Sequence, residues 1–302
     1  MQQVVMIGGP TAVGKTALAI HLAQTHRVRL INADAFQIYR GMDIGTAKPT
    51  TAEQAAAPHH LIDIKDPSEP FTVAQFMTLA KAEIQRAAES SELPVLVGGT
   101  GFYLNALRLN LPLGTAAASP ARVRWQAFAD AHGQEALWQA LQQRDPVSAA
   151  KIPAANTRRV VRALEVIENT GRPFSNQKPA IPIYETLVIG LTTARELLYQ
   201  RINQRVDAMV QAGLLDEVRR VKIAAGDNRQ ALAAIGYKEF LPYLAGDGTL
   251  DDAVELVKRN SRRYAKRQLT YFHNQMPAHW FDLVQQPSEL AQIDQLITDW
   301  QH

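Results

Sequence analysis

The sequence predicts an α/β protein in which a parallel sheet is flanked by helices and interrupted by an inserted all-helical domain. Three observations predict this fold class. Short, β-rich apolar runs alternate with helix-periodic stretches over the first hundred residues, as in a sheet built from β–α units. Two further strand-like runs follow residue 183. The stretch between these blocks is rich in Ala, Gln and Arg, has helical periodicity and contains no convincing strand.

Each expected element follows from the local sequence. The expected strands are short and apolar, and they are Val4–Ile7, Val28–Ile31, Pro94–Val97, Tyr184–Leu191 and His279–Leu283. Helical periodicity covers Lys15–Thr25 and Val73–Glu89, and a longer amphipathic pattern over Glu196–Ala224 is interrupted near Gly213. We therefore assign residues 1–113 and 183–302 to an α/β core that ends in helices, and residues 114–182 to the helical insertion.

The composition is that of an ordinary globular protein. Of the 302 residues, 46% are hydrophobic and 20% are charged. The chain has no cysteine, which excludes disulfides, iron–sulfur clusters and cysteine-based zinc sites. No apolar run approaches the length that spans a membrane, and the N-terminal run lacks the basic flank of a signal peptide. We therefore expect a cytoplasmic protein with no membrane partner, acting as a monomer.

The segment after the first expected strand is a phosphate-binding loop. It has the spacing of a P-loop and consists of Gly9, Pro10, Thr11, Ala12, Val13, Gly14, Lys15 and Thr16. Glycines at both ends allow a tight turn in which successive N–H groups point at one anion, and the following helix adds its positive dipole end. Lys15 adds a charge, and the Thr16 hydroxyl can ligate Mg²⁺. The loop therefore predicts a bound phosphate or diphosphate on a P-loop NTPase-like fold.

Asp34 is the second candidate functional residue. It directly follows the second expected strand, and ligands of parallel sheets bind at the carboxyl ends of the strands. Three roles are open from spacing alone: a cap of the next turn, a Mg²⁺-linked carboxylate, or a general base acting on a second substrate.

The end of the next expected strand narrows the function class. It reads Gly98-Gly99-Thr100-Gly101 and has no acidic residue, whereas ATP-hydrolysing P-loop proteins usually carry a metal-holding Asp there. A small-molecule transferase is therefore favoured over a motor or switch ATPase. We expect Gly98 and Gly99 to let the backbone approach a ligand closely, with the Thr100 hydroxyl beside it.

Positive charge is clustered along the chain, although the net charge is only +3. Arg158, Arg159 and Arg162 fall on one helical face of the insertion. A second basic stripe lies near the C-terminus and consists of Lys258, Arg259, Arg262, Arg263, Lys266 and Arg267. Each stripe fits an ordinary solvated helix face, but two stripes together with a phosphate site favour a polyanionic partner. The His59–His60 pair is expected to be structural, because no third metal ligand stands at a suitable spacing.

Over nearly its whole length the chain resembles the tRNA dimethylallyltransferases, also called tRNA isopentenyltransferases. The segments that carry the resemblance are GPTAVGKT (Gly9–Thr16), NADAFQIYRGMDIGTAKP (Asn32–Pro49), PHHLIDIKDP (Pro58–Pro67), LVGGTGFY (Leu96–Tyr103), NTRRVVRALEV (Asn156–Val166), LYQRINQRVDAMVQAGLLDEV (Leu198–Val218), AIGYKE (Ala234–Glu239) and NSRRYAKRQLTYF (Asn260–Phe272). The family segment around Asp34 resembles ISxDSMQIY. Here Ala33, Ala35 and Phe36 depart from it, while Asp34 and Gln37 remain.

The resemblance implies a prenyl transfer to tRNA. The dimethylallyl group would move from dimethylallyl diphosphate to the exocyclic N6 of the adenine immediately 3′ of the anticodon. The P-loop and Arg205 would hold the leaving diphosphate, with Mg²⁺ as cofactor. Asp34 would act as the general base on N6, with Lys15 and Thr100 as further catalytic residues.

The resemblance also assigns contacts with the anticodon stem-loop of tRNA. They fall on three parts of the chain, namely Asp34, Ala35, Phe36, Gln37 and Thr100; then Arg122, Arg158, Arg159, Val160, Val161 and Arg162; and then Ala233, Ala234, Ile235, Gly236, Tyr237 and Lys238. Val123 is an alternative to Arg122, because the spacing measured from Pro120 differs from that measured from Gly133. The target adenine would leave its stack to reach the site.

Three other functions compete with this interpretation. A P-loop kinase of a small molecule shares the loop and the acidic residue but leaves the two basic stripes unexplained. An adenylate isopentenyltransferase would prenylate free nucleotides and would not need the segments matched to tRNA contacts. A non-catalytic RNA-binding protein could hold the nucleic acid backbone with the loop, but it would not need Asp34, Lys15 and Thr16 together.

Overall fold

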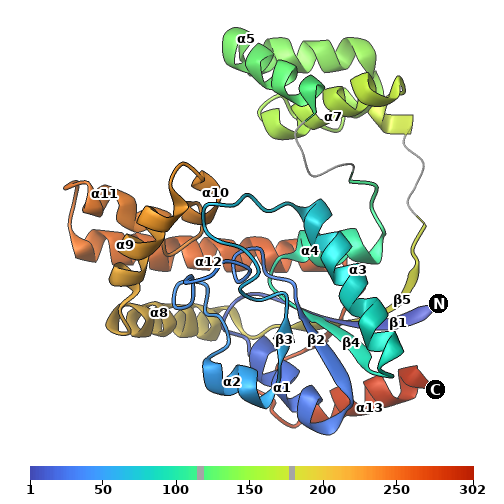
Figure 1. Cartoon of the computed structure of the whole chain (residues 1–302), viewed down its shortest axis with the longest axis vertical. Coiled ribbons are helices and arrows are strands. Elements are labelled where there is room, and N and C mark those ends of the chain that lie inside the picture. Colours follow the sequence, from blue (N-terminus) through green and yellow to red (C-terminus); the bar gives the residue numbers. More distant parts are fainter. Residues whose placement is uncertain (114–118, 177–180) are drawn as a thin grey trace. The chain divides into compact units, whose positions relative to one another are not determined.

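Figure 1 shows the computed structural model, which describes residues 1–113, 119–176 and 181–302. The chain forms two compact units: unit 1 is Met1–Leu111 with Pro182–His302, and unit 2 is Pro112–Ile181. Residue 114, where the sequence predicts the insertion to begin, lies outside the described residues. Unit 1 contains the sheet, and the regular structure described in unit 2 is helical.

The described part of unit 1 contains one parallel sheet, with strands β1 (Gln2–Gly8), β2 (Val28–Asn32), β3 (His59–His60), β4 (Leu93–Val97), β5 (Tyr184–Leu191) and β6 (His279–Phe281). The strand order is β3-β2-β4-β1-β5-β6, and every neighbouring pair is parallel. The five strands expected from the sequence are confirmed. The edge strand β3 was not expected, because two polar residues carry no strand pattern; it is defined only by its pairing with Leu30 and Ile31 of β2.

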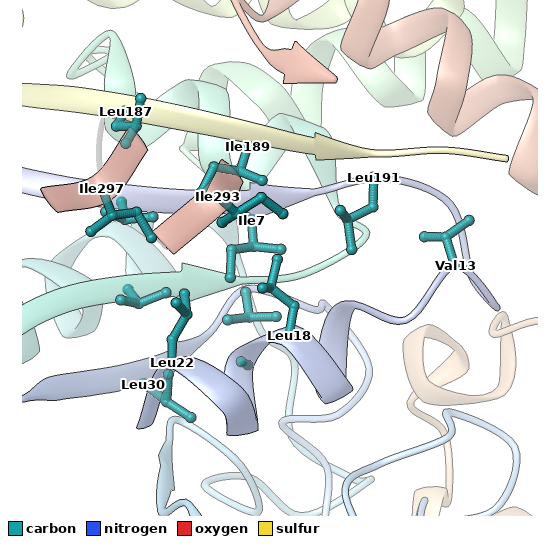
Figure 2. Close-up of a cluster of buried hydrophobic side chains, with 14 of the residues drawn as sticks. Ile7, Val13, Leu18, Leu22, Leu30, Leu187, Ile189, Leu191, Ile293 and Ile297 are labelled. Atoms are coloured by element: carbon teal, nitrogen blue, oxygen red, sulfur yellow. The ribbon is translucent and has the colours of Figure 1, made fainter. Parts of the chain in front are cut away.

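Alternating side chains of the strands face two different helical layers. Figure 2 shows the cluster on one face, in which strand residues point toward side chains of α1 (Lys15–Thr25) and α13 (Glu289–Gln301). Its labelled members are Ile7, Val13, Leu18, Leu22, Leu30, Leu187, Ile189, Leu191, Ile293 and Ile297. Helices α3 (Val73–Glu89) and α4 (Gly101–Arg108) contact β2, β4 and β1. The sheet is thus flanked by helices, as predicted.

Helices α8 (Arg195–Gln211) and α9 (Leu214–Ala225) replace the long helical pattern of the sequence. Gly213 separates them with a φ of 96°, a left-handed conformation that glycine adopts without strain. The predicted break near Gly213 is therefore confirmed. The other helices of unit 1 are α2 (Thr51–Ala56), α10 (Arg229–Leu232), the 3₁₀ turn η2 (Lys238–Phe240), α11 (Leu241–Leu244) and α12 (Leu250–Gln275), which packs on α8 and α4. No helix described in unit 1 or unit 2 is long and apolar enough to cross a membrane.

Unit 2 has a small core of its own. Its elements are α5 (Pro120–Arg144), α6 (Pro146–Ala149), α7 (Thr157–Thr170) and the 3₁₀ turn η1 (Phe174–Asn176). Helix α5 is interrupted at Gly133, where φ is 82°. Trp125, Leu137 and Leu141 of α5 pack against Val160 and Leu164 of α7. The helical character predicted for this stretch is confirmed.

Candidate active site

The phosphate loop, Asp34 and Thr100 follow three neighbouring strands. The loop follows β1, Asp34 lies two residues after β2, and Thr100 lies three residues after β4. Because β4 lies between β2 and β1, and all three run in one direction, their carboxyl ends meet at the same edge of the sheet. This register is the structural reason why residues far apart in sequence form one site.

One cavity of about 700 Å³ opens at this edge. The predicted site residues that line it are Thr11, Ala12, Gly14, Lys15, Thr16, Asp34, Phe36, Gln37, Arg205, Ala233, Ala234, Ile235, Gly236 and Lys238. Gly9, Pro10 and Val13 are buried in the loop. A Cβ on Gly9 would lie 2.4 Å from the Leu191 carbonyl oxygen, so close packing against β5 requires glycine at this position.

The loop places the first turn of α1 at the cavity. Gly14 caps the helix in a left-handed conformation, and Lys15 and Thr16 begin it. The unpaired N–H groups of a helix N-terminus attract anions. The Lys15 Nζ donates to the Pro10 carbonyl oxygen at 2.5 Å, which folds the lysine across the loop. The geometry matches the phosphate cradle that the spacing predicts.

Arg205 brings a second positive charge to the loop from α8. Its Nη1 donates to the Thr11 Oγ1 at 3.2 Å, and Arg201, on the same helix, donates to the Ala12 carbonyl oxygen at 2.8 Å. Burial, with Arg205 as a further cause, lowers the pKa of Lys15 to about 8, while Asp34 acts in the opposite direction. Lys15, Arg201 and Arg205 thus lie with the helix terminus at one cavity, an arrangement suited to a multiply charged anion.

The Asp34 carboxylate lies close to these cations and has a perturbed pKa. Its Oδ1 accepts a hydrogen bond from the Phe36 N–H at 2.9 Å, so the capping role considered for this residue is present. Burial raises the pKa of Asp34, and the Phe36 N–H, the Lys15 charge, the Gln37 N–H and the Arg205 charge only partly oppose that rise. A carboxylate with a raised pKa at a cavity is a stronger base than a solvated one.

Asn32, which the sequence analysis did not single out, orients Asp34. Its Oδ1 accepts the Asp34 N–H at 3.1 Å, and its Nδ2 donates to the Leu61 carbonyl oxygen at 3.1 Å. The residue is the last of β2 and is only 3% exposed. A buried polar residue at the end of a strand was the available signal, but its partner Leu61 is 29 residues away.

Thr100 is tied to the same turn. Its Oγ1 accepts the Ala35 N–H at 3.1 Å, and it also interacts with the hydroxyl of Tyr264 on α12. Burial and then the Asp34 charge raise the pKa of Tyr264 to about 12, which keeps the phenol protonated at neutral pH. Thr100 thus links β4, α12 and the turn after β2. Thr100 and Ala35 are not among the residues that line the cavity, so they lie beside it rather than on its surface.

Gly98 and Gly99 have a packing role, and the close approach to a ligand that the sequence suggests stays a prediction. Both line the cavity, but the close approach that demands glycine is to the protein itself. A Cβ on Gly98 would lie 2.3 Å from the Ala33 carbonyl oxygen, and one on Gly99 would lie 2.3 Å from the Gln268 Nε2. These glycines therefore allow the strand ends to pack on each other and on α12.

Several residues assigned to tRNA contact in unit 1 are held by the protein. The Gln37 Nε2 donates to the carbonyl oxygens of Thr46 and Ala47, each at 3.2 Å. Tyr237 and Ala234 are buried, whereas Ala233 and Lys238 are exposed. The two ends of the segment at residues 233–238 are thus its exposed residues, while Ala234, Ile235 and Gly236 between them also line the cavity.

Unit 2 separates its predicted tRNA residues into three groups. Arg158 and Arg159 are exposed at the start of α7. The side chains of Val160 and Val161 do not reach the surface, because they pack in the core of unit 2. Arg162 donates to Glu165 at 2.8 Å and to the Leu113 carbonyl oxygen at 2.9 Å.

Arg122 in unit 2 shares the Glu165 carboxylate. Its Nε lies 3.7 Å from Glu165, whereas the alternative Val123 is 59% exposed. Although burial acts to raise the pKa of Glu165, hydrogen bonds from Arg162 and Ser119 hold it below its usual range. Glu165 is therefore an anionic anchor between α5 and α7.

The second basic stripe is divided in a similar way. Lys258 pairs with Asp207 and Glu255, and Arg262 donates to Asn203. Arg267 stacks over the Tyr264 ring and lines the cavity. Arg259, Arg263 and Lys266 are exposed. One part of this stripe therefore fixes α12 to α8, and another is available to a ligand.

The loop offers one oxygen ligand that would suit Mg²⁺, so a bound anion would have to supply further ligands to the ion. Among the described residues, no group of three or more His, Cys, Asp or Glu side chains could hold a metal ion by itself. The Thr16 side chain lines the cavity beside Lys15 and offers a hydroxyl oxygen, which is the donor type Mg²⁺ prefers. His59 also lines the cavity, but its Nδ1 lies 2.7 Å from the Ala57 carbonyl oxygen, and the Nδ1 of His60 lies 3.5 Å from Glu83.

Comparison with known proteins identifies the family. The family model described as IPP transferase matches residues 37–275. The chain belongs to the IPP transferase family. A tRNA dimethylallyltransferase of Lacticaseibacillus casei (strain BL23) is 57% identical over 300 residues, which cover 99% of this chain and 97% of that protein. A tRNA dimethylallyltransferase of Latilactobacillus sakei is 50% identical over 304 residues, which cover 99% of this chain and 98% of that protein.

Solved IPP transferases share the fold. The full-length tRNA isopentenylpyrophosphate transferase of Bacillus halodurans is 46% identical, with a TM-score of 0.75 over 99% of this chain and 96% of that one. A eukaryotic dimethylallyltransferase, described as acting on tRNA, is 28% identical, with a TM-score of 0.87 over 99% of this chain and 79% of that one. The predicted family and P-loop NTPase-like fold class are confirmed.

Proposed function

We propose that the protein transfers the dimethylallyl group from dimethylallyl diphosphate to N6 of the adenine 3′ of the anticodon in tRNA, and releases diphosphate. Membership of the IPP transferase family supports an enzyme that modifies tRNA. The observation that carries the chemistry is that Asp34, Lys15 and Arg205 line one cavity, in which burial raises the pKa of Asp34 and lowers the pKa of Lys15. A base and an anion cradle within one cavity are what this reaction requires.

The cradle stabilises the leaving group. As the bond between the allylic carbon and the diphosphate oxygen breaks, its electron pair leaves with the diphosphate. Negative charge grows on oxygens that face the N–H groups of the loop, the Lys15 ammonium and the Arg205 guanidinium. The Thr16 hydroxyl would help to hold Mg²⁺, whose charge would further neutralise the leaving group.

Asp34 activates the acceptor. The amine of adenine is a weak nucleophile, because its lone pair is delocalised into the ring. A carboxylate that accepts a hydrogen bond from N6 orients the amine and takes its proton as the new N–C bond forms. The raised pKa of Asp34 improves this proton transfer near neutral pH. Thr100, hydrogen-bonded to the turn beside Asp34, would contact the incoming base.

The tRNA would bind as a stem-loop whose target base is flipped out. Bases of a single-stranded loop are the least costly to unstack. Arg158 and Arg159 in unit 2, and Lys238 and Phe36 in unit 1, offer charge and an aromatic face for these contacts. We also propose that the enzyme acts in the cytoplasm and as a monomer. The monomer is supported by the finding that Asp34, Lys15 and Arg205 of a single chain line one cavity.

Mass measurement of the product tests this function against the alternatives. The protein is incubated with dimethylallyl diphosphate, or with ATP in its place, and with either unmodified tRNA or AMP as the acceptor, and the tRNA is then digested to oligonucleotides by a base-specific ribonuclease. The proposal predicts one five-carbon addition on the adenosine 3′ of the anticodon, lost in Asp34→Ala. Phosphate transfer from ATP would indicate a kinase, and prenylation of AMP but not of tRNA would indicate an adenylate isopentenyltransferase. Binding of tRNA without any product would indicate a non-catalytic protein.

A further inference from the structure

Part of the cavity surface is built from irregular backbone. Residues 43–48, here called the wall loop, contribute Gly45, Thr46, Ala47 and Lys48 to the lining. Residues 233–238, here called the wall segment, contribute all of their positions except Tyr237. Neither has the hydrogen-bond ladder of a strand. Each has a few backbone hydrogen bonds of tight turns, and side chains supply further partners for its backbone.

The Glu217 carboxylate on α9 gathers donors from both. Its Oε2 accepts the N–H groups of Asp43 and Ile44, at 3.0 and 2.9 Å. Its Oε1 accepts the Gly45 N–H at 2.9 Å and the Tyr237 hydroxyl at 2.6 Å. The residue is 2% exposed. One buried carboxylate therefore satisfies three successive amides of the wall loop and the aromatic residue of the wall segment.

The partners of the Glu217 carboxylate are neutral, so hydrogen bonds rather than an opposite charge stabilise it, and loss of any of them is costly. A buried carboxylate is tolerated only when hydrogen bonds replace its water, and here four donors do so. The converse also holds, because buried amides left without an acceptor cost more than the hydrogen bond itself contributes. Loss of the carboxylate thus releases the wall loop in particular.

Close packing couples the wall loop to the wall segment. A Cβ on Gly45 would lie 2.5 Å from the Tyr237 ring, and one on Gly236 would lie 3.7 Å from the Gly45 carbonyl oxygen. Burial, followed by the Glu217 charge, raises the pKa of Tyr237 well above its usual range, so its hydroxyl remains a donor. We therefore expect a displacement of the wall loop to displace the wall segment, and the reverse.

The wall loop is also joined to the turn that carries Asp34. Gln37, three residues after Asp34, donates to the carbonyl oxygens of Thr46 and Ala47. The buried Lys48 Nζ lies 2.9 Å from the Tyr39 carbonyl oxygen and 2.6 Å from the Asp63 carboxylate. The wall loop is thus connected to Asp34 through the side-chain amide of Gln37 and the backbone between these two residues, without a direct contact with Asp34.

We infer that Glu217 is a positioning residue, which holds the wall loop and the wall segment in the shape that binds the substrates. Glu217 does not line the cavity, so it acts through residues that do. The kinetic consequences of this inference rest on the proposed dimethylallyl transfer, whereas its structural consequences do not.

Three variants test the inference: Glu217→Gln, Tyr237→Phe and Asp216→Asn. In Glu217→Gln, the new NH₂ group can be accommodated only by donating to the Tyr237 oxygen, which leaves the Gly45 N–H without an acceptor. Tyr237→Phe keeps the hydrogen bonds that the three backbone N–H groups donate to Glu217, and it removes only the hydroxyl donor. Asp216→Asn is the matched control, because this neighbour on α9 is exposed and pairs with Arg219.

Amide hydrogen exchange and inorganic pyrophosphate binding are measured on each full-length variant. In Glu217→Gln we expect amide exchange at Asp43, Ile44 and Gly45 to accelerate at least about tenfold, with the largest effect at Gly45. The reason is that local opening of the wall loop no longer breaks a charge-assisted hydrogen bond. We expect pyrophosphate affinity to fall about fivefold or more, and the KM for tRNA to rise more than kcat falls. Tyr237→Phe should move the same quantities by less, and Asp216→Asn should match the wild type.

Unchanged exchange in Glu217→Gln would overturn the inference, as would faster exchange with wild-type pyrophosphate affinity and KM. Should Glu217→Gln fail to fold, Tyr237→Phe decides: wild-type exchange at the wall segment and wild-type KM would overturn the positioning role. A protein with no prenyl transfer at all, but with the expected changes in exchange and pyrophosphate binding, would refute the proposed function and leave the role of Glu217 standing.

Discussion

At the scale of single residues, the site concentrates charges that are costly to bury. Asp34 has a raised pKa and Lys15 a lowered one, and burial is the main cause of both shifts. Each group is therefore held in an environment that disfavours its charged form. Such perturbation is expected where a protein uses a base and an anion-binding cation close together.

The pKa of Lys15 predicts how anion binding depends on pH. Lys15 is charged below its pKa of about 8 and loses its charge as the pH rises through that value. Pyrophosphate affinity of the free protein should therefore weaken above about pH 8. Lys15→Arg keeps its charge in this range, so its affinity should not show that loss. Affinity is measured by calorimetry for both proteins at each pH. The protonation of pyrophosphate changes both affinities equally, so it cancels from their ratio. A loss of affinity that is identical in Lys15→Arg would rule out Lys15 as its source.

The residues that could be found from sequence are those whose role is encoded locally. Lys15 and Thr16 follow from the spacing of the loop, and Asp34 follows from its position after a strand. Asn32 and Glu217 could not be found in this way. Their partners Leu61 and Asp43 stand 29 and 174 residues away, so only the fold brings them together.

At the scale of elements, α8 matters because it carries an arginine to a loop formed at the other end of the sequence. Arg205 and Arg201 reach Thr11 and Ala12 across 194 and 189 residues. Periodicity predicts that α8 is a helix, but it does not determine which residue faces the loop. The resemblance supplied Arg205, and the geometry is consistent with that assignment.

Arg205→Gln tests the contribution of α8 to anion binding. Loss of the guanidinium removes one of the two side-chain cations, Lys15 and Arg205, that the proposal places on the diphosphate, and pyrophosphate affinity should fall about tenfold or more. Arg195→Gln is the matched control, because Arg195 opens the same helix, is exposed and packs over Tyr199 away from the cavity lining. Isothermal titration with pyrophosphate measures both. Equal affinities in the two variants would contradict a role of Arg205 in binding the diphosphate.

The elements missed by sequence analysis are those fixed by tertiary contacts. Strand β3 has two residues and exists through its pairing with β2. The wall loop has no periodic pattern, and its conformation depends on Glu217 and on the buried Lys48. In contrast, α1 and α3 coincide with the predicted ranges. Helix α1 buries Leu18, Ala19 and Leu22 at helical spacing, whereas α3 has an apolar face along its length and a capping box at Thr72.

At the scale of the whole molecule, the chain combines a sheet unit that holds the reactive groups with a helical unit that presents exposed arginines. Each unit has its own core, so substitutions on the surface of unit 2 should leave the cavity of unit 1 intact. Binding of tRNA and chemistry can thus be perturbed separately.

Arg159→Glu exploits this separation. Reversal of one exposed charge at the start of α7 should weaken tRNA binding and reduce the slope of affinity against salt concentration by about one phosphate contact. Arg172→Glu is the control, with the same charge change just beyond the other end of α7. Affinity is measured at several salt concentrations, and the pyrophosphate affinity should be unchanged in both. If the tRNA affinity and its salt dependence are unaltered in Arg159→Glu, Arg159 is not part of the proposed tRNA interface.

The most direct measurement is the single-turnover rate of dimethylallyl transfer to tRNA in Asp34→Asn. The amide has the size of the carboxylate and can still accept the Phe36 N–H, but it cannot take a proton from N6. We predict a rate lower by about 10²–10⁴-fold, with tRNA and pyrophosphate affinities close to those of the wild type and no fall in unfolding temperature. A rate that stays close to the wild-type value would contradict the assignment of Asp34 as the base.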